Sequence, residues 1–441
     1  MRTATIRFTF ALMIAFIPIG MQGALAEDGD WLDERTKFWN DKGRIGGQIR
    51  LRGESFNDFD FNDDVETDGR DDDFLLSRIR LSLDLNPSEL LRLYIEIQDS
   101  HQFETDTPKA FRVGGTARED RLDIYQAFVD VRPIPAVPLT VRVGRHELSY
   151  GNQRLVGAFG WSNVGRSFQG VKARFETEAF FADTFFANVI VPEDRHFNDE
   201  EHDDDFYGVY GGWKEFPTGV IEGYFLARDN EITGLHTYTF GTRLAGHLLD
   251  SQAVDYAVEL AIQTGDAPAG RDQEAFAAHA GGGYTFKKCA ATPRLGIEYN
   301  YSTGDDDPAD GKNETFDNLF PTNHLHYGYM DLFSWRNLHN LRLSASAKPI
   351  EKLTLKCDVH FFWLDEAADG WRSASGAVIR PGKAGADDFV GEEIDLTLSY
   401  AFNNHLSFQA GYSHFFPGEF VDETGPDDDA DWVYLQTTFT F

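Results

Sequence analysis

Apolar and polar residues alternate along most of the chain, from about residue 44 to the last residue. The stretch RIRLSLDL, residues 78–85, puts isoleucine and leucine on one face and arginine, serine and aspartate on the other. The stretch LRLYIEIQ, residues 91–98, repeats this arrangement. Because successive side chains of a strand point to opposite faces, this period of two predicts β-strands rather than helices.

Segments of this kind predict about 18 strands, near residues 43–55, 73–86, 89–102, 120–132, 138–148, 167–177, 180–191, 205–214, 218–228, 236–249, 252–264, 274–288, 292–303, 337–348, 352–364, 389–402, 404–415 and 431–441. A soluble β-sandwich also alternates, since one face of each sheet is solvated. However, many of these segments approach the 9–11 residues with which a tilted strand crosses a bilayer, whereas soluble strands usually have about 5–6. Strand length therefore favours a membrane barrel.

The predicted connections alternate strictly between short and long. The short ones lie near Asn86–Pro87, Thr177–Ala179, Phe216–Thr218, Leu249–Ser251, Ala290–Thr292, Pro349–Glu351 and Asn403–Asn404. Outer-membrane barrels have this wiring, with short turns on the periplasmic side and long loops outside. The chain also closes on the apolar strand WVYLQTTFTF, similar to the final strand of bacterial outer-membrane proteins.

The predicted fold class is therefore all-β. We expect a transmembrane, antiparallel, up-and-down β-barrel with short periplasmic turns and long Asp-rich extracellular loops. A barrel of about 16–18 strands encloses an aqueous channel, whereas one of about 8 strands is filled by its own side chains. The aromatic content of 14% fits girdles at the two membrane interfaces.

Residues 1–26 have the order of a secretory signal peptide. Two arginines precede a short apolar run, and Ala24 and Ala26 offer a cleavage site. The alternative, an N-terminal core helix, would begin at the initiator methionine without a capping residue. We therefore expect residues 27–441 to form a single barrel domain in an outer membrane of the Gram-negative type.

Most of the acid behind the formal net charge of -33 lies in the predicted long loops. The acidic runs are Asn57–Asp73, Glu193–Asp205, Gly304–Gly311 and Asp422–Asp431, all expected on the cell exterior. Such runs are commonly solvated loops. The alternative is calcium binding, for which the candidate ligands are Asp71, Asp72, Asp73, Asp203, Asp204 and Asp205. None of the runs has EF-hand spacing, and we expect no other cofactor and no nucleic-acid partner.

Arginine lies instead on the polar faces of the predicted strands, at Arg50, Arg52, Arg78, Arg80, Arg92, Arg142, Arg174, Arg294 and Arg342. These side chains are expected to face the lumen, because an arginine on the lipid face costs about 2–4 kcal/mol at mid-depth. Some are expected to pair across strands with Asp84, Glu96 or Glu298. Pairing does not account for the excess of base over acid on these faces, so the sequence predicts a cationic, anion-selective lumen.

The stretch RVGRHELSYGNQRLVGAFGWSNVGRSFQGVKARF, Arg142–Phe175, resembles the alginate export family of outer-membrane channels. The matching pieces are GR, LSYGNQRL, a single tryptophan, GRSF and GVKARF, in that order. The early SRIRLSLDL and the closing aromatic strand also fit. The resemblance implies an 18-stranded barrel with an arginine-rich lumen, through which a linear polyuronate leaves the cell.

The resemblance also implies a cationic constriction. Arg145, Arg154 and Arg166 bracket a loop, Leu148–Arg166, that is expected to fold inward and narrow the pore. Further constriction residues are expected at Arg142 and Arg174 in the wall below, and at Arg52, Arg78, Arg80 and Arg342. The alternative for this loop is a structural plug held by Trp161 and Tyr150, with its arginines paired to acids.

Three other functions are alternatives to polymer export. An uptake porin for small anions or acidic oligosaccharides would share the cationic lumen. An enzyme is disfavoured, because His146, Glu147 and Ser149 are near neighbours on a strand and point to different faces. A surface adhesin would depend on calcium in the acidic loops.

The two cysteines, Cys289 and Cys357, are too few for a disulfide scaffold, and we expect them to be unbonded. The expected partners are an anionic polysaccharide, outer-membrane lipid and periplasmic export proteins.

Overall fold

The computed structural model describes residues 34–59, 61, 71–103, 118–132, 137–193, 196–248 and 252–441. Three sequence predictions fall wholly or mostly outside the described residues: the signal peptide 1–26, the acidic run Asn57–Asp73 and the turn Leu249–Ser251. Signal-peptide cleavage therefore stays a prediction.

Long antiparallel strands make up most of the described chain. They are β2 (Gly43–Asn57), β3 (Asp72–Ser88), β4 (Leu91–Phe103), β5 (Asp120–Val131), β6 (Leu139–His146), β7 (Phe168–Glu176), β8 (Phe180–Val191), β9 (Asp199–Phe216), β10 (Gly219–Asn230), β11 (Leu235–Leu248), β12 (Val254–Ala267), β13 (Arg271–Thr285), β14 (Arg294–Ser302), β16 (Leu338–Ile350), β17 (Leu353–Trp363), β20 (Phe389–Ala401), β21 (Leu406–Pro417) and β22 (Ala430–Thr440). The short elements are β1 (Lys37–Phe38), β15 (Lys312–Asn313), β18 (Trp371–Arg372), β19 (Val378–Arg380) and α2 (Glu419–Thr424).

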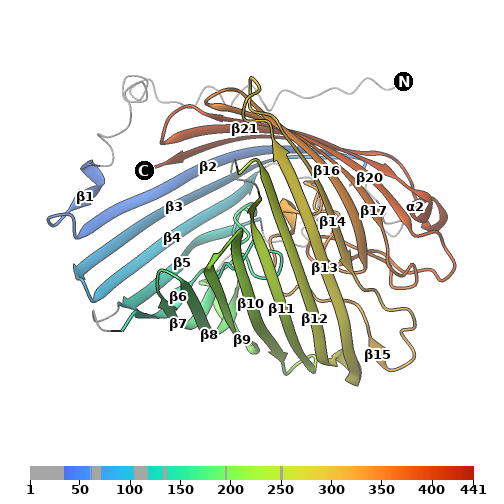
Figure 1. Cartoon of the computed structure of the whole chain (residues 1–441), viewed down its shortest axis with the longest axis horizontal. Helices are drawn as coiled ribbons and strands as arrows, with labels where there is room; N and C mark the ends of the chain where they lie inside the picture. The colour runs from blue at the N-terminus through green and yellow to red at the C-terminus, as the bar shows by residue number, and fades with distance from the viewer. Residues whose placement is uncertain are drawn as a thin grey trace.

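The long strands form a closed barrel. Each pairs antiparallel with the next long strand along the chain, and β22 pairs with β2 to complete the ring. The main sheet contains 20 strands among the described residues, and two of them, β1 and β15, have only two residues each, so 18 strands form the wall. Figure 1 shows this wall, with α2 and β15 at the end away from the C-terminus. The predicted fold class is confirmed.

The alternating sequence pattern separates the two faces of the wall. On β3, Ile79 and Leu81 lie on the outer face and are 48% and 44% exposed. Arg78, on the inner face of the same strand, is 4% exposed. The outward apolar row can face lipid, and the polar row lines the interior. Among the described residues, no helix is long and apolar enough to cross a membrane.

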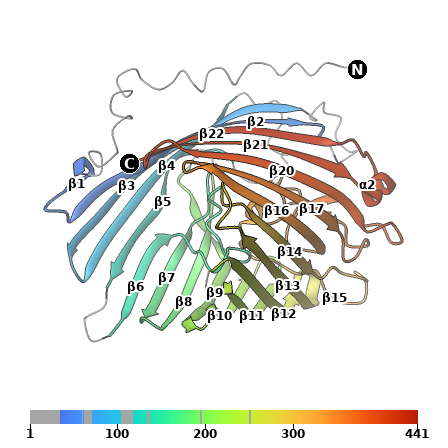
Figure 2. The ribbon, with the colours of Figure 1, turned by 45° about the horizontal axis from the view of Figure 1, so that its top comes forward.

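Two long loops fold into the interior of the barrel. We name residues 147–167, between β6 and β7, inner loop 1, and residues 303–337, between β14 and β16, inner loop 2. Their apolar side chains, including Leu148, Phe316 and Trp335, are fully buried. Figure 2 shows loop segments crossing the barrel interior. The hydrophobic core cluster of the described residues therefore lies inside the barrel rather than between packed layers.

One loop prediction is wrong. The acidic run Glu193–Asp205 is not a loop over its whole length, because β9 begins at Asp199. Its acidic residues extend the ladder with both neighbours, for example through the pairs Ile190↔Glu200 on β8 and Asn230↔Asp204 on β10. Backbone pairing with two long neighbouring strands outweighs the low strand preference of aspartate.

Candidate functional site

The two inner loops join each other across the lumen. Val156 of inner loop 1 and Phe320 of inner loop 2 form an isolated parallel bridge. The Gly157 amide donates to the Phe320 carbonyl at 2.9 Å, and the Phe320 amide donates to the Leu155 carbonyl at 2.9 Å. The loops therefore behave as one obstruction in the middle of the channel, since moving either one breaks these bonds.

Four arginines of the barrel wall hold the tip of inner loop 1. We name Arg50 and Arg52 of β2, with Arg78 and Arg80 of β3, the arginine cluster. Arg50 and Arg78 both donate to the Ser162 carbonyl, at 2.8 and 2.9 Å. The other two donate to neighbouring carbonyls, Arg52 to Trp161 at 2.8 Å and Arg80 to Val164 at 3.1 Å.

The arginine cluster has little negative charge beside it. Arg52 pairs with Glu54 at 2.7 Å, and Arg80 lies 3.9 Å from Glu96. Arg50 and Arg78 are each only 4% exposed, and no carboxylate within the described part of the chain lies at ion-pair distance from either. Backbone carbonyls and the side chains of Asn163 and Gln48 accept from their terminal nitrogens, while neither Nε has an acceptor among the described residues, so no carboxylate neutralises these two charges directly.

Aromatic rings support the same arginines. The Arg52 guanidinium lies 3.9 Å from the centre of the Trp161 ring, and Arg80 lies 3.7 Å from the Tyr125 ring. Trp161 in turn stacks on His324 of inner loop 2, with ring centres 4.1 Å apart. Gly165 allows the chain to pass close to Arg80 and Tyr125. It has a φ of +82°, and a Cβ there would lie 2.7 Å from the Tyr125 hydroxyl.

Arg154 ties inner loop 1 to the opposite wall. Its guanidinium donates to Glu298 of β14 at 2.7 Å and to the Tyr327 hydroxyl of inner loop 2 at 3.0 Å. Burial alone lowers the pKa of Arg154, but Tyr327 and Glu298 outweigh it and hold the pKa above its usual value. The neighbouring His326 is held neutral, because burial and the adjacent Arg154 charge lower its pKa well below the usual range.

Arg166 and Arg145 also act through backbone carbonyls. Arg166 donates to Pro321 of inner loop 2 at 2.8 Å and to Gly157 at 3.3 Å, and burial lowers its pKa to about 10. Arg145 donates to Ile124 at 2.8 Å and to Asn198 at 2.9 Å, and it lies 3.7 Å from Asp123. Arg166 therefore fastens the end of inner loop 1 to inner loop 2, whereas Arg145 ties β6 to β5 and to the residue before β9.

The family model for alginate export matches residues 42–434. The chain belongs to the alginate export family. It is thus an outer-membrane channel and not an enzyme. No curated protein matches the chain in sequence.

Solved structures support the fold of this alginate export family channel. OccK8 (OprE) from Pseudomonas aeruginosa superposes with a TM-score of 0.62 at 10% identity, covering 90% of this chain and 98% of that one. OccAB2 from Acinetobacter baumannii gives 0.59 at 10% identity, with coverages of 90% and 98%. The outer membrane protein opdK from Pseudomonas aeruginosa gives 0.59 at 10% identity, also with 90% and 98%. At this identity the likeness concerns the fold alone.

The remaining predicted constriction residues of the channel are paired with acids. Arg142 makes a bidentate contact with Asp130 at 2.7 and 2.9 Å. Arg174 lies 2.8 Å from Glu176 and 3.4 Å from Asp183. Arg342 lies 3.1 Å from Asp358. The predicted excess of base is therefore confined to one part of the wall, because strand-borne acids neutralise the arginines elsewhere.

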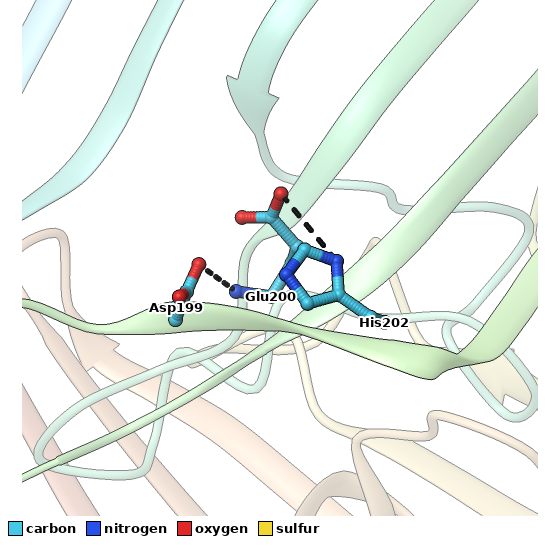
Figure 3. Close-up of side chains that lie close together, drawn as sticks. All are labelled: Asp199, Glu200 and His202. Atoms are coloured by element: carbon cyan, nitrogen blue, oxygen red, sulfur yellow. Dashed lines mark hydrogen bonds and ion pairs between the residues drawn. The ribbon is translucent and has the colours of Figure 1, made fainter.

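The candidate calcium ligands do not gather into a site. Asp204 binds Arg228 through both oxygens, at 2.8 and 2.5 Å, and Asp71 accepts from the Asp58 amide at 3.2 Å. Among the described residues, the acidic groups close enough to share a cation are instead Asp199 with Glu200 and His202, and Asp305 with Asp306 and Glu314. Figure 3 shows the first group on β9, where the visible contacts join its members to each other.

The sequence pattern did not predict inner loop 2 or one anchor of inner loop 1. The prediction for inner loop 2 covered only its acidic start, Gly304–Gly311, although the stretch from Phe316 to Trp335 is rich in aromatic and aliphatic residues. The missed anchor is Asn163, whose side-chain amide donates to the carbonyls of Ser77, His101 and Arg118 at 3.1, 3.2 and 2.8 Å. An asparagine in a loop gives no signal of this kind in a single sequence.

Proposed function

We propose that this channel carries an anionic polysaccharide of the polyuronate type out of the cell. The observation that carries the proposal is the arginine cluster, in which Arg50 and Arg78 have carbonyl acceptors but no carboxylate at ion-pair distance within the described residues. A polyuronate has about one carboxylate per sugar ring, and arginine binds carboxylates in bidentate pairs. Membership of the alginate export family supports the outward direction.

In this proposal, the tip of inner loop 1 occupies the places that substrate carboxylates take. The carbonyls of Gly160, Trp161, Ser162 and Val164 now accept from the arginine cluster. When the tip withdraws, successive carboxylates of the polymer replace these carbonyls. Several modest sites in a row suit transport, because each must bind well enough to admit the chain and weakly enough to release it.

Current through single channels in a planar bilayer tests the proposal. Under a salt gradient the wild type is expected to prefer anions, and added polyuronate is expected to block the current where a neutral polysaccharide of equal length does not. The double variant Arg50→Gln/Arg78→Gln should weaken both effects. A matched control is Arg142→Gln/Asp130→Asn, which removes a bidentate ion pair without changing the net charge. Cation selectivity of the wild type would overturn the proposal.

A second candidate is uptake of small anions or acidic oligosaccharides. The joined inner loops favour it, because they divide the lumen and leave a cavity of about 840 Å³, within the range of small-molecule sites. Length dependence separates the two functions. A polymer conduit passes long and short uronates, whereas an uptake channel for small solutes passes only short ones and is blocked by long ones.

A further inference from the structure

The cavity of about 840 Å³ lies in the periplasmic half of the lumen. Its wall comes from the ends of β10–β14 that adjoin the short turns, and Tyr256 and Gly246 mark that end. Its roof comes from both inner loops, through Arg154 of the first and His326 of the second. We name this cavity the periplasmic vestibule. It lies on the side of the joined loops from which an exported substrate arrives.

The lining of the periplasmic vestibule is charged and mixed in sign. Five cationic side chains line it: Arg154, Lys214, Arg243, Arg294 and Arg342. Three carboxylates line it: Glu222, Asp255 and Glu298. Two of the cations also pair with carboxylates outside the lining, Lys214 with Glu176 at 2.6 Å and Arg342 with Asp358 at 3.1 Å, so the lining combines charge-paired cations with several hydrogen-bond acceptors.

One of these pairs is open to a ligand, and a second is largely buried. Arg294 binds Asp255 through two contacts of 2.8 and 2.5 Å, and each side chain remains 33% exposed. Arg243 forms an ion pair with Glu222 on the neighbouring strand, with the two side chains 15% and 10% exposed. Arg154, in contrast, is 1% exposed and already bound to Glu298. A ligand carboxylate can therefore reach Arg294 directly, and can reach Arg243 once Glu222 turns aside, without rearrangement of the roof.

The chemistry of this lining favours an acidic sugar over a simple anion. A uronic acid residue offers one carboxylate for an arginine and several hydroxyls that donate to carboxylates such as Glu222 or Asp255. Inorganic phosphate is compact, carries more negative charge and has only one or two hydroxyl donors, and these carboxylates repel it. Phe181 and Tyr256 add aromatic surface to the lining. The volume has room for a short oligosaccharide rather than a single small ion.

We infer that the periplasmic vestibule binds the leading end of the polyuronate before it passes the joined loops. Arg294 and Arg243 take the substrate carboxylates, while Asp255 and Glu222 turn to the sugar hydroxyls. This inference rests on the proposed function and adds to it the place and the side of first capture. The arginine cluster, which contacts the tip of inner loop 1, serves the later part of the path.

The test is block of single-channel current by a uronate tetramer, added to each side of a planar bilayer in turn. Cys289 lies exposed at the short turn between β13 and β14, so a membrane-impermeant thiol reagent assigns the orientation of each channel in a Cys357→Ser background. The variants are Arg243→Gln/Arg294→Gln and the conservative Arg294→Lys, with Arg142→Gln/Asp130→Asn as the control outside the vestibule. Correct folding is checked by the heat-dependent mobility of each variant in gels.

We expect stronger block from the Cys289 side. The double variant is expected to weaken that block about tenfold or more, because each charged hydrogen bond contributes at least that order in affinity. Arg294→Lys should weaken it less, and the control should not change it. Block only from the far side, unchanged block in the double variant, or equal block by inorganic phosphate or a neutral tetramer would each overturn the inference. If long polyuronate still blocks the channel in those cases, the proposed function survives without the vestibule; no block by any uronate contradicts both.

Discussion

Arg154 and Glu298 join inner loop 1 to the barrel wall through a hydrogen bond of 2.7 Å. The same guanidinium donates to Tyr327, so one side chain connects the wall and both inner loops. Arg154 is buried, and a buried cation that loses its partner is costly. This contact therefore determines how firmly the obstruction in the channel is held.

Removing the charge of Glu298 should loosen the inner loops. Breaking a buried ion pair from one side commonly costs about 3–5 kcal/mol, and Glu298 retains 20% exposure, so we expect Glu298→Gln to cost toward the lower end of that range. Single channels of this variant should open more often or conduct more. The matched control is Glu274→Gln, which removes an exposed pair with Lys312. Unchanged gating and unchanged thermal stability of Glu298→Gln would contradict this role.

A disulfide between the two inner loops should lock them. Val156 and Phe320 pair as neighbours in a β-bridge, a spacing compatible with disulfide geometry. The variant Val156→Cys/Phe320→Cys, made with both native cysteines replaced by serine, should pass little polyuronate when oxidised and regain passage after reduction. Each single cysteine variant serves as the control. Equal passage by the oxidised and reduced double variant would show that the loops need not separate.

The Trp161 ring should contribute measurably to the stability of inner loop 1. Trp161→Ala removes the ring beneath Arg52 and the stack on His324. We expect the protein to lose about 1–3 kcal/mol, less than for a fully buried tryptophan, together with weaker block by polyuronate. Urea unfolding in detergent measures the loss. Trp39→Ala, at a ring that is 54% exposed, should change the unfolding free energy little.

The packing of the inner loops should weaken in mild acid because of His326. Its pKa in the folded protein lies well below the usual value, owing to burial and the adjacent Arg154 charge, while Glu298 and Arg342 also face it. A histidine with a lowered folded pKa stabilises the fold above about pH 6.5, and that contribution falls as the pH drops further.

Channel opening measured between about pH 7 and pH 5 checks this prediction. Opening of the wild type should increase as the pH falls, and His326→Gln should reduce that dependence. His202→Gln is the control, because its side chain is 72% exposed. An equally steep pH dependence in His326→Gln would assign the effect to another group.

The barrel could be predicted from the sequence almost strand by strand, because the lipid imposes a strict alternation on every wall strand. The prediction of a loop over Glu193–Asp205 was wrong, because its acidic composition is typical of loops. The ladder of β8 and β10 continues past that point and carries the acidic residues with it. Pairing between strands is a property of the assembled sheet and is not visible in the local composition.

The site was less predictable than the wall. The family resemblance predicted that inner loop 1 folds inward. The alternating pattern predicted that Arg52, Arg78 and Arg80 face the lumen, where they contact this loop. The sequence did not reveal which arginines lack a carboxylate partner. Partners such as Asp130 for Arg142 come from neighbouring strands, and the register of those strands must be known to identify them. Inner loop 2 was missed because a loop that fills a lumen has no period of its own.

Release of labelled oligouronate from proteoliposomes tests the central claim most directly. Vesicles containing the purified channel would be loaded with a uronate oligomer and, separately, with a neutral oligomer of the same length. The account predicts faster release of the uronate, with the preference reduced in Arg50→Gln/Arg78→Gln and retained in Arg142→Gln/Asp130→Asn. Equal release of the two oligomers, or faster release of the neutral one, would contradict the claim that this channel selects an anionic polysaccharide.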